Sequence, residues 1–204
     1  MTAASAPGLM NAPRAVIFDL DGTLADSALD FDAIRAEIGL EPGLPILEQL
    51  ATADAETCAR AEIIMRRHER DAIAGARLTD GCAELLAHLV GRRIPIGILT
   101  RNIREVVETF ARTFNFAFQA IYTREDGPPK PSPAGVLVLC EKLGATPADT
   151  LVVGDFTFDV LAGQRAGCRT VLLRADPLPP EDHEAWGRPD LVVRSLHELI
   201  PLFP

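Results

Sequence analysis

The stretch that decides the fold is Ala15-Val16-Ile17-Phe18-Asp19-Leu20-Asp21-Gly22-Thr23-Leu24. Its first four residues are apolar at every position, which predicts a strand that is buried on both faces. Two carboxylates, two positions apart, follow this run directly. Carboxylates at the end of a buried strand are costly to desolvate unless another group pairs with them. The stretch therefore predicts a core strand that delivers Asp19 and Asp21 to a functional site.

Further short apolar runs predict strands that alternate with helices through the C-terminal two thirds of the chain. They are Ile94–Leu99, Ala120–Tyr122, Leu151–Val153, Thr170–Leu173 and Leu191–Val193. Strands separated by helices imply a parallel sheet with right-handed crossovers. The predicted fold class is therefore α/β, a Rossmann-like parallel sheet flanked by helices.

Capping and stop signals predict where the helices begin and end. Asn102 can cap a helix that runs to Phe114, and Ser132 with Pro133 can open another. A third helix is predicted from about Thr157 to Gly167, where a glycine can end it. The remaining predicted helices are Cys82–Leu89 and a last short helix after the capping box Ser195–Glu198. These signals place a helix after most of the predicted strands, as an α/β fold requires.

The segment from about residue 28 to 76 breaks the alternation, because it contains helical patterns and no convincing strand. The expected helices are Phe31–Ile38, Ile46–Ala53 and Ala55–Ala74. We interpret residues 28–76 as an inserted α-helical cap, residues 12–27 and 77–204 as the Rossmann-like core, and residues 1–11 as a flexible tail. The basic cluster at residues 66–70 on the long cap helix is typical of a solvated face.

Composition limits the classes of protein to which this chain can belong. With 204 residues, 48% of them hydrophobic and 24% charged, the chain can bury a sizeable core. A net charge of -9 argues against a nucleic-acid partner, and the apolar runs are too short to span a membrane. Four scattered cysteines indicate buried thiols in a cytoplasmic protein. Whether the protein is a monomer or a homodimer stays open.

Polar residues follow other predicted strands as well as the first one. Thr100 and Arg101 end the run Ile94–Leu99, Asp155 and Asp159 follow Leu151–Val153, and Lys130 precedes a predicted helix. The carboxyl ends of strands in an open parallel sheet line one crevice, where ligands bind. We expect all of these side chains to meet there, together with Asp19 and Asp21.

These residue types suit phosphoryl transfer. An aspartate can act as a nucleophile that forms an acyl phosphate. Several carboxylates facing a phosphate would repel it, since unit charges about 4 Å apart interact by about 4 kcal/mol at an effective dielectric constant near 20. Hard carboxylate oxygens select Mg²⁺, which is the cofactor that we expect.

The ordered set carries a family resemblance. Asp19-Leu20-Asp21-Gly22-Thr23, Thr100, Lys130 and Gly154-Asp155 with Asp159 stand in the order of the four motifs of the haloacid dehalogenase-like hydrolases. The resemblance covers essentially Arg14 to Leu202. The helical insertion after the first motif is similar to the small cap of the phosphoglycolate phosphatase-like branch. The resemblance thus implies a magnesium-dependent phosphatase for a small phosphorylated metabolite.

The resemblance also implies roles for the residues of the first motif. Asp19 would attack phosphorus and form an aspartyl-phosphate. Asp21 would protonate the leaving alcohol and then take a proton from the hydrolytic water. Gly22 would let the backbone turn sharply beside the ligand.

The other motifs would hold the phosphate and the metal. Thr100 and Lys130 would bind the phosphate oxygens, and Arg101 could reach a substrate anion or form a salt bridge at the rim of the sheet. Magnesium would be held by Asp19, the backbone carbonyl of Asp21, and Asp155. Asp159 would act on the water shell of the metal or on Lys130, or would only face the dipole of its helix.

Several alternative functions stay open at this point. Asp21 favours a phosphatase over a dehalogenase, because an alkoxide needs a proton on leaving and a halide does not. A phosphomutase would have the same site and would return the phosphoryl group to its substrate. A non-catalytic, phosphate-responsive signalling domain also gathers aspartate, threonine and lysine at the ends of strands, although its phosphorylated aspartate lies on a later strand.

Overall fold

The computed structural model describes residues 12–176, 178, 183, 184 and 186–204 of the chain. The predicted tail, residues 1–11, lies outside the described residues. The chain divides into two compact units, one of which contains Ser27–Ala76 and the other the rest of the chain.

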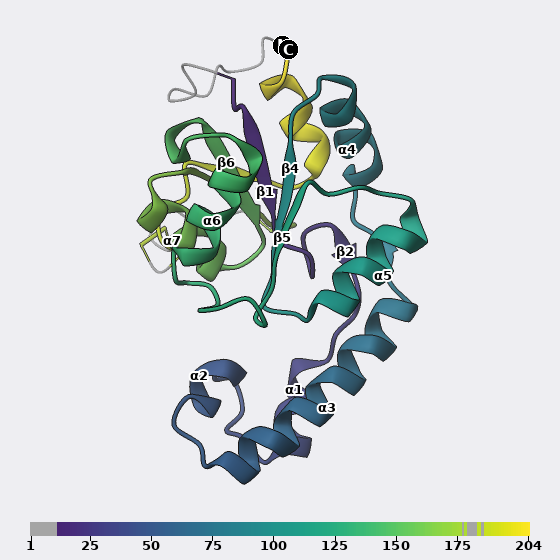
Figure 1. Ribbon diagram of the computed structural model, residues 1–204, viewed down its shortest axis with the longest axis vertical. Helices are drawn as coiled ribbons and strands as arrows, with labels where there is room; N and C mark the ends of the chain where they lie inside the picture. The colour runs from purple at the N-terminus through teal and green to yellow at the C-terminus, as the bar shows by residue number, and fades with distance from the viewer. Residues whose placement is uncertain (1–11, 177, 179–182, 185) are drawn as a thin grey trace. The chain divides into compact units, whose positions relative to one another are not determined.

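The larger unit is an α/β fold. Its main strands are β1 (Ala15–Phe18), β4 (Ile96–Leu99), β5 (Ala120–Tyr122), β6 (Thr150–Gly154), β7 (Arg169–Leu173) and β8 (Leu191–Val193). They form one parallel sheet in the order β5-β4-β1-β6-β7-β8 (Figure 1). The helices are α4 (Cys82–Gly91), α5 (Arg104–Phe114), α6 (Ala134–Leu143) and α7 (Thr157–Ala166), with the 3₁₀ helices η1 (Pro147–Asp149) and η3 (Leu196–Leu202). The α/β fold class that the sequence predicts is confirmed.

Strand β1 lies in the middle of the sheet, between β4 and β6. Phe18 is in register with Ile98 of β4 on one side and with Val153 of β6 on the other. The chain therefore leaves these three strands at the same edge of the sheet. Strands added after β1 lie on both sides of it, and this topological switch is where open α/β sheets bind ligands.

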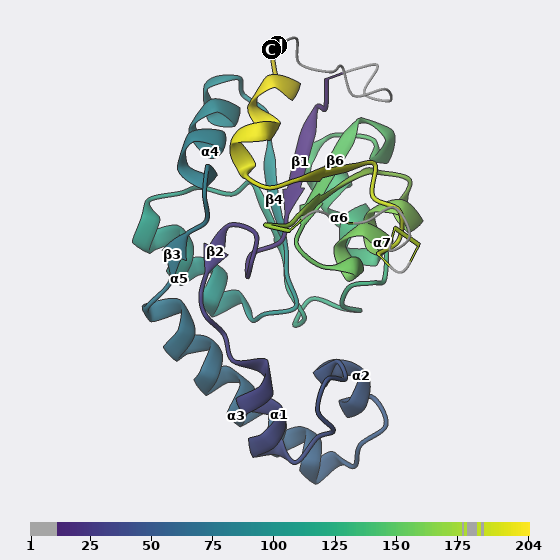
Figure 2. The same ribbon diagram turned by 180° about the vertical axis from the view of Figure 1, so that it is seen from behind.

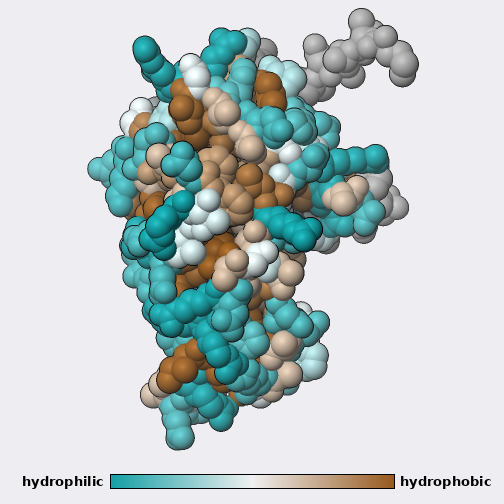
Figure 3. Space-filling model, turned by 90° about the vertical axis from the view of Figure 1, so that its right-hand side faces the viewer, coloured by the Kyte–Doolittle hydropathy of each residue, from teal (hydrophilic) through white to brown (hydrophobic). Residues whose placement is uncertain are grey.

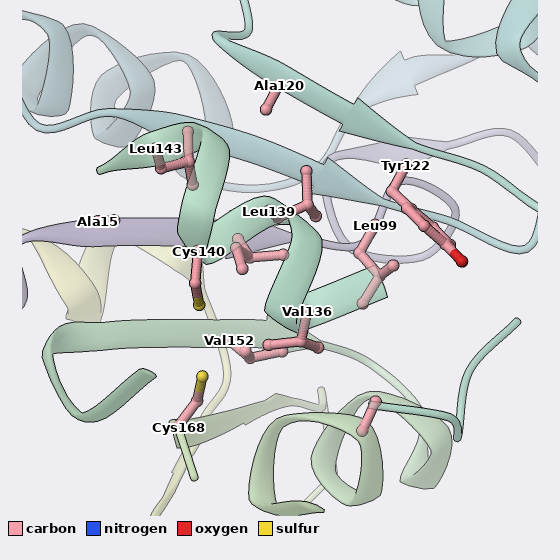
Figure 4. Close-up of a cluster of buried hydrophobic side chains, with 12 residues drawn as sticks. Ala15, Leu99, Ala120, Tyr122, Val136, Leu139, Cys140, Leu143, Val152 and Cys168 are labelled. Atoms are coloured by element: carbon pink, nitrogen blue, oxygen red, sulfur yellow. The ribbon is translucent and has the colours of Figure 1, made fainter. Parts of the chain in front are cut away.

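Helices cover both faces of the sheet. Helices α6 and α7 pack against each other and over β1, β4, β6 and β7, while α4 and η3 pack together on the opposite face (Figures 1 and 2). One buried cluster fills the space under α6 and includes Leu99, Tyr122, Val136 and Leu139. The sulfur atoms of Cys140 and Cys168 point toward one another within this cluster (Figure 4). All four cysteines are free thiols, and only Cys58 is not fully buried.

The smaller unit is helical and has a hydrophobic cluster of its own. It contains α1 (Phe31–Ile38), α2 (Ile46–Leu50) and α3 (Ala55–Ala74). The cluster is formed by Ile34, Ile38, Ile46, Ala61, Ile64 and Met65. Part of the basic cluster at residues 66–70 is neutralised within this unit, because Arg66 pairs with Glu62, and Arg67 pairs with Glu37.

The chain leaves the larger unit and returns to it through two short antiparallel strands. They are β2 (Ala25–Asp26) and β3 (Arg77–Leu78), in which Asp26 is paired with Arg77. The sequence did not predict them, since two residues are too few to show an alternating pattern.

The predicted elements agree with the structure except at some of their ends. Helix α5 begins at Arg104 with Ile103 as its N-cap, so the prediction of Asn102 as the cap was wrong. Helix α6 begins at Ala134, one residue later than predicted, and Pro133 is its N-cap. Helix α2 ends at Leu50 rather than at Ala53. Strand β4 begins at Ile96, because Pro95 has no N–H to donate to a ladder.

Most of the large apolar side chains are buried. The exposed exceptions among the described residues include Val90, Leu137 and Phe156. On the face drawn in Figure 3, hydrophobic residues occur in patches among hydrophilic ones. In the described part of the chain, no helix is both long and apolar enough to cross a membrane.

Candidate active site

The loop after β1 is a tight turn that rests on a glycine. Gly22 has φ +76°, and its N–H donates to the carbonyl of Ala25 at 2.8 Å. A Cβ atom at this position would lie 2.1 Å from Oδ2 of Asp155. Only glycine fits both the backbone conformation and this close approach. Gly22 thus lets the first-motif loop lie directly against the carboxylate that follows β6.

Three carboxylates meet at the ends of β1 and β6. Asp19, Asp155 and Asp159 can each offer one oxygen so that all three atoms lie within 4.8 Å of one another. Lys130, which is 2% exposed, lies among them. Its Nζ is 2.7 Å from Oδ1 of Asp19 and 2.6 Å from Oδ1 of Asp159. The lysine therefore crosslinks the candidate nucleophile to the fourth motif.

Burial and like charges shift the pKa values of this cluster. Burial, followed by the charges of Asp19 and Asp159, raises the pKa of Asp155 to about 8. Burial also raises the pKa of Asp159 to about 6, despite its contact with Lys130. Burial alone would lower the pKa of Lys130, but the charges of Asp159 and Asp19 outweigh it and raise this pKa. One ammonium group does not neutralise three carboxylates.

The cluster fits a divalent cation on the chemistry of its donors. Carboxylate oxygens are the ligands that Mg²⁺ prefers, and one oxygen from each of the three aspartates lies within 4.8 Å of the others. Burial favours the protonated form of Asp155, and a bound cation would instead stabilise its ionised form. Both oxygens of Asp159 already have partners, Lys130 and the backbone N–H of Phe156 at 3.1 Å.

The side chain of Asp21 lies apart from the three clustered carboxylates. Its Oδ2 accepts a hydrogen bond of 3.0 Å from Nδ2 of Asn102, which is 4% exposed. The Oδ1 atom of Asn102 accepts from the N–H of Ile103 at 2.7 Å, so the amide is held at both ends. Asp21 is thus oriented by a residue that the sequence predicted only as a helix cap.

Thr100 directly follows β4, next to the first motif. It is 2% exposed, its N–H donates to the carbonyl of Tyr122, and its Oγ1 accepts from the N–H of Asn102 at 3.0 Å. Because Oγ1 serves as an acceptor there, its own proton is available for an incoming oxygen atom. Thr100 can therefore donate to a phosphate at this edge of the sheet.

Arg101 is turned toward the loop that carries Lys130. Its Nη1 donates to the carbonyl of Lys130 at 2.8 Å, and its guanidinium lies over the ring of Phe158, 4.6 Å from the centroid. The two outcomes that the sequence left open, a substrate contact or a salt bridge, are not decided by these contacts. A role for Arg101 in binding substrate stays a prediction.

The structure thus brings most of the predicted residues into contact with one another. Lys130 joins Asp19 to Asp159, Gly22 touches Asp155, and Thr100 and Asp21 share a partner in Asn102. One residue that sequence reasoning missed is Asn102. Its position two residues after Thr100 was the available signal, but an asparagine ahead of a helix is more often a cap.

Comparisons with known proteins agree with this geometry. A family model described as haloacid dehalogenase-like hydrolase matches residues 13–167. A haloacid dehalogenase-like hydrolase domain-containing protein of Arabidopsis thaliana is 31% identical over 91% of this chain and 82% of its own length. The N-acetylmuramic acid 6-phosphate phosphatase of Pseudomonas putida is 32% identical over 91% of this chain and 94% of its own length.

The fold is also shared with solved structures. One described as a predicted phosphoglycolate phosphatase from Haemophilus somnus has a TM-score of 0.73 and 21% identity, covering 96% of this chain and all of its own. The protein belongs to the haloacid dehalogenase-like hydrolase family. The expected class of enzyme, a phosphoric monoester hydrolase of this family, is confirmed.

Proposed function

We propose that this hydrolase is a magnesium-dependent phosphatase that cleaves a small phosphomonoester through an aspartyl-phosphate on Asp19. The observation that carries the proposal is the contact of Lys130 with both Asp19 and Asp159, at 2.7 and 2.6 Å. An ammonium group has three donors, so one is left for a phosphate oxygen after these two contacts. The same lysine can therefore hold the nucleophile and the group that it attacks.

In the first half of the reaction, a carboxylate oxygen of Asp19 attacks phosphorus and the bond to the ester oxygen breaks. Asp21 gives its proton to the leaving alkoxide. Asn102 keeps the carboxyl of Asp21 in place through the hydrogen bond at Oδ2. The alcohol leaves, and the phosphoryl group stays on Asp19.

In the second half, Asp21 takes a proton from a water molecule that attacks the phosphorus of the aspartyl-phosphate. Inorganic phosphate is released and the carboxylate of Asp19 is restored. Thr100 and Lys130 donate to the phosphoryl oxygens in both halves and stabilise the charge that develops there.

Magnesium would be held by Asp19, the backbone carbonyl of Asp21, and Asp155. It would supply positive charge to the carboxylates and to the transferred group. Asp159 has its two oxygens on Lys130 and on the N–H of Phe156, which supports its alternative role of holding the lysine. We assign Asp159 to that positioning role.

The substrate class that we propose is a small phosphorylated metabolite, with phosphoglycolate and N-acetylmuramic acid 6-phosphate as the first compounds to test. The names of the relatives above support these choices. Helices α1, α2 and α3 would act as the cap that selects the leaving group. The thiols of the free cysteines persist in a reducing compartment, and we place the activity in the cytoplasm.

The proposal is tested by hydrolysis of 4-nitrophenyl phosphate with Mg²⁺ and with EDTA. We expect metal-dependent turnover that falls by at least about 10³-fold in Asp19→Asn, since the amide is not a nucleophile. Asp26→Asn, an exposed aspartate on β2, is the matched control and should leave the rate unchanged. A wild-type protein that is equally inert with and without the metal would contradict the proposal.

Water labelled with ¹⁸O separates a phosphatase from a phosphomutase. We expect the label to appear in the released phosphate, because water attacks phosphorus in the second half of the proposed reaction. Transfer of an unlabelled phosphoryl group to a second site on the substrate would instead assign the mutase reaction.

A further inference from the structure

A cavity of about 400 Å³ opens beside the acidic cluster, within the larger unit. Gly22 and Asp155 form one wall, which the cavity shares with the candidate active site. Arg174 and Arg194 line it at the ends of β7 and β8, and neither has a place in the proposed reaction.

The sheet register sets these two arginines side by side. Leu173 is paired with Val193, so the next residues along both strands are Arg174 and Arg194. The N–H of Arg174 also donates to the carbonyl of Val193 at 2.8 Å. Paired residues of neighbouring strands lie about 5 Å apart at their backbones. The backbones of the two arginines are thus neighbours at the same edge of the sheet, and both residues line the cavity.

The positive charge of this pair is not neutralised within the described residues. The structure gives neither guanidinium a hydrogen bond or an ion pair there, and the Nε of Arg174 is buried without a partner. Arg194 is exposed, so water can solvate its charge, whereas the buried Nε of Arg174 has no partner among the described residues. A bound oxyanion would supply an acceptor to Arg174 and a counter-charge to both arginines.

Arg174 is also fixed in place. Its guanidinium lies over the ring of Trp186, 4.3 Å from the centroid. A stacked guanidinium keeps its in-plane N–H donors free for a planar fork of oxygens. The stacking therefore prepares Arg174 to bind an oxyanion.

The described carboxylates that line the cavity form no ion pair with Arg174 or Arg194. Asp155 is one of the three clustered carboxylates of the candidate metal site. Asp80 and Asp176 are exposed residues of the lining, and Oδ1 of Asp80 lies 3.9 Å from Nε2 of His197. These exposed carboxylates remain hydrated and give the cavity a polar rim.

The geometry points to a second oxyanion site in this cavity, in which Arg174 and Arg194 bind a phosphate or carboxylate group separate from the group that reacts at Asp19. The ligand is either a second anionic group on the substrate itself or a free anion that acts as an effector. The site rests on the two arginines and on Trp186, and its existence does not depend on the proposed reaction.

The site is tested by titrating inorganic phosphate into ¹⁵N-labelled protein with Mg²⁺ present, and following the Nε–Hε signal of Arg174 and the amide of Ala175. We expect saturable shifts at both signals. In Arg174→Met with Arg194→Met, the phosphate affinity read at Ala175 should fall at least about tenfold, whereas Arg112→Met on the exposed side of α5 should match the wild type.

Lys130→Met distinguishes this site from the proposed active site, because it should leave the shifts at Arg174 intact. Circular dichroism melting checks that each variant is folded. The inference is overturned if wild-type Arg174 and Ala175 show no saturable shift, or if the double arginine variant binds phosphate at Ala175 with wild-type affinity.

Kinetics then separate the two sources of the anion. If the site binds a second anionic group of the substrate, the double arginine variant should raise the KM for phosphoglycolate, which has a carboxylate beside its phosphate, at least about tenfold. The KM for 4-nitrophenyl phosphate should be unchanged. If it binds a free effector, sulfate should change the kcat for 4-nitrophenyl phosphate in the wild type and not in the double variant.

Discussion

At the residue scale, the side-chain amide of Asn102 holds the carboxyl of Asp21. Asn102 donates to its Oδ2 at 3.0 Å and is itself held through its Oδ1. We expect Asn102→Ala to lower kcat by about 10- to 100-fold, because a displaced acid and base loses its alignment with the reacting atoms. Steady-state kinetics with 4-nitrophenyl phosphate measure this, and inhibition by inorganic phosphate should be unchanged.

The isostere Asn102→Asp is the matched variant for this prediction. It keeps the shape of the side chain but sets an acceptor against the carboxylate of Asp21, so it should lower kcat at least as much as the alanine variant. Full kcat in both variants would show that Asn102 does not position Asp21.

The raised pKa values in the acidic cluster make stability depend on pH when no metal is bound. Burial raises the pKa of Asp155 to about 8 and that of Asp159 to about 6. The folded protein therefore keeps protons on Asp155 and Asp159 that the unfolded chain releases near pH 4. The contribution of these protons to the free energy of unfolding is lost as the pH rises through the pKa values of the folded state. In EDTA we expect the Tm to fall from pH 5 to pH 7.

Magnesium and one substitution are the controls for this pH dependence. Saturating Mg²⁺ should reduce the fall in Tm between pH 5 and pH 7, because the ion replaces the protons on the carboxylates. Asp155→Asn in EDTA should also reduce this fall in Tm. A Tm in EDTA that is the same at pH 5 and pH 7, with and without Asp155, would contradict the raised pKa.

Spacing along the chain predicts some of the contacts at the candidate site and not others. The meeting of Asp19, Lys130 and Asp159 could be predicted because each residue follows or precedes a recognisable strand or helix. Asn102 could not be predicted as a partner of Asp21, because the two are far apart in sequence and an asparagine before a helix has a local explanation. Arg174 and Arg194 were not predicted to be neighbours either, because only the register of β7 and β8 sets their backbones side by side.

At the element scale, the position of α6 depends on a close approach to the sheet. A Cβ on Gly135 would lie 2.5 Å from Cδ1 of Leu99 and 2.7 Å from Cδ1 of Tyr122. Overpacking of this kind costs about 1–3 kcal/mol, against a helix-propensity gain of about 1 kcal/mol for alanine. We expect Gly135→Ala to lower the free energy of unfolding, as measured by urea denaturation.

Gly91 at the end of α4 is the matched control for Gly135. Nothing lies within 4 Å of a Cβ at that position. Gly91→Ala should therefore leave stability unchanged or raise it by up to about 1 kcal/mol. Equal effects of the two substitutions would mean that α6 can move away from the sheet without loss.

The ends of elements were harder to predict than the elements themselves. Helix α2 stops at Leu50 because Asp54 must adopt an extended conformation to cap α3, where it accepts from the N–H of Thr57 at 2.9 Å. Strands β2 and β3 exist through their pairing with each other, which a period-2 pattern cannot show in two residues. Local propensity predicts the interior of an element, whereas its end is decided by contacts with other segments.

At the scale of the whole molecule, each unit has a hydrophobic cluster of its own. The insertion begins after Asp26 and ends before Arg77, which are paired neighbours in the β2–β3 ladder. The chain thus returns to the larger unit directly opposite the point where it leaves. A two-residue turn can join such a pair, and Asn-Gly is the preferred sequence for it.

Replacing residues 27–76 by Asn-Gly therefore tests what the insertion does. Every residue of the proposed reaction lies outside it, so we expect a folded protein that hydrolyses 4-nitrophenyl phosphate with Mg²⁺ at a kcat within about tenfold of the wild type. If the insertion is the cap that selects the leaving group, the spread of kcat/KM over a panel of phosphorylated metabolites should narrow at least about tenfold. Wild-type discrimination in the shortened chain would place selection in the larger unit, and a folded but inactive chain would mean that the insertion supplies a group to the reaction itself.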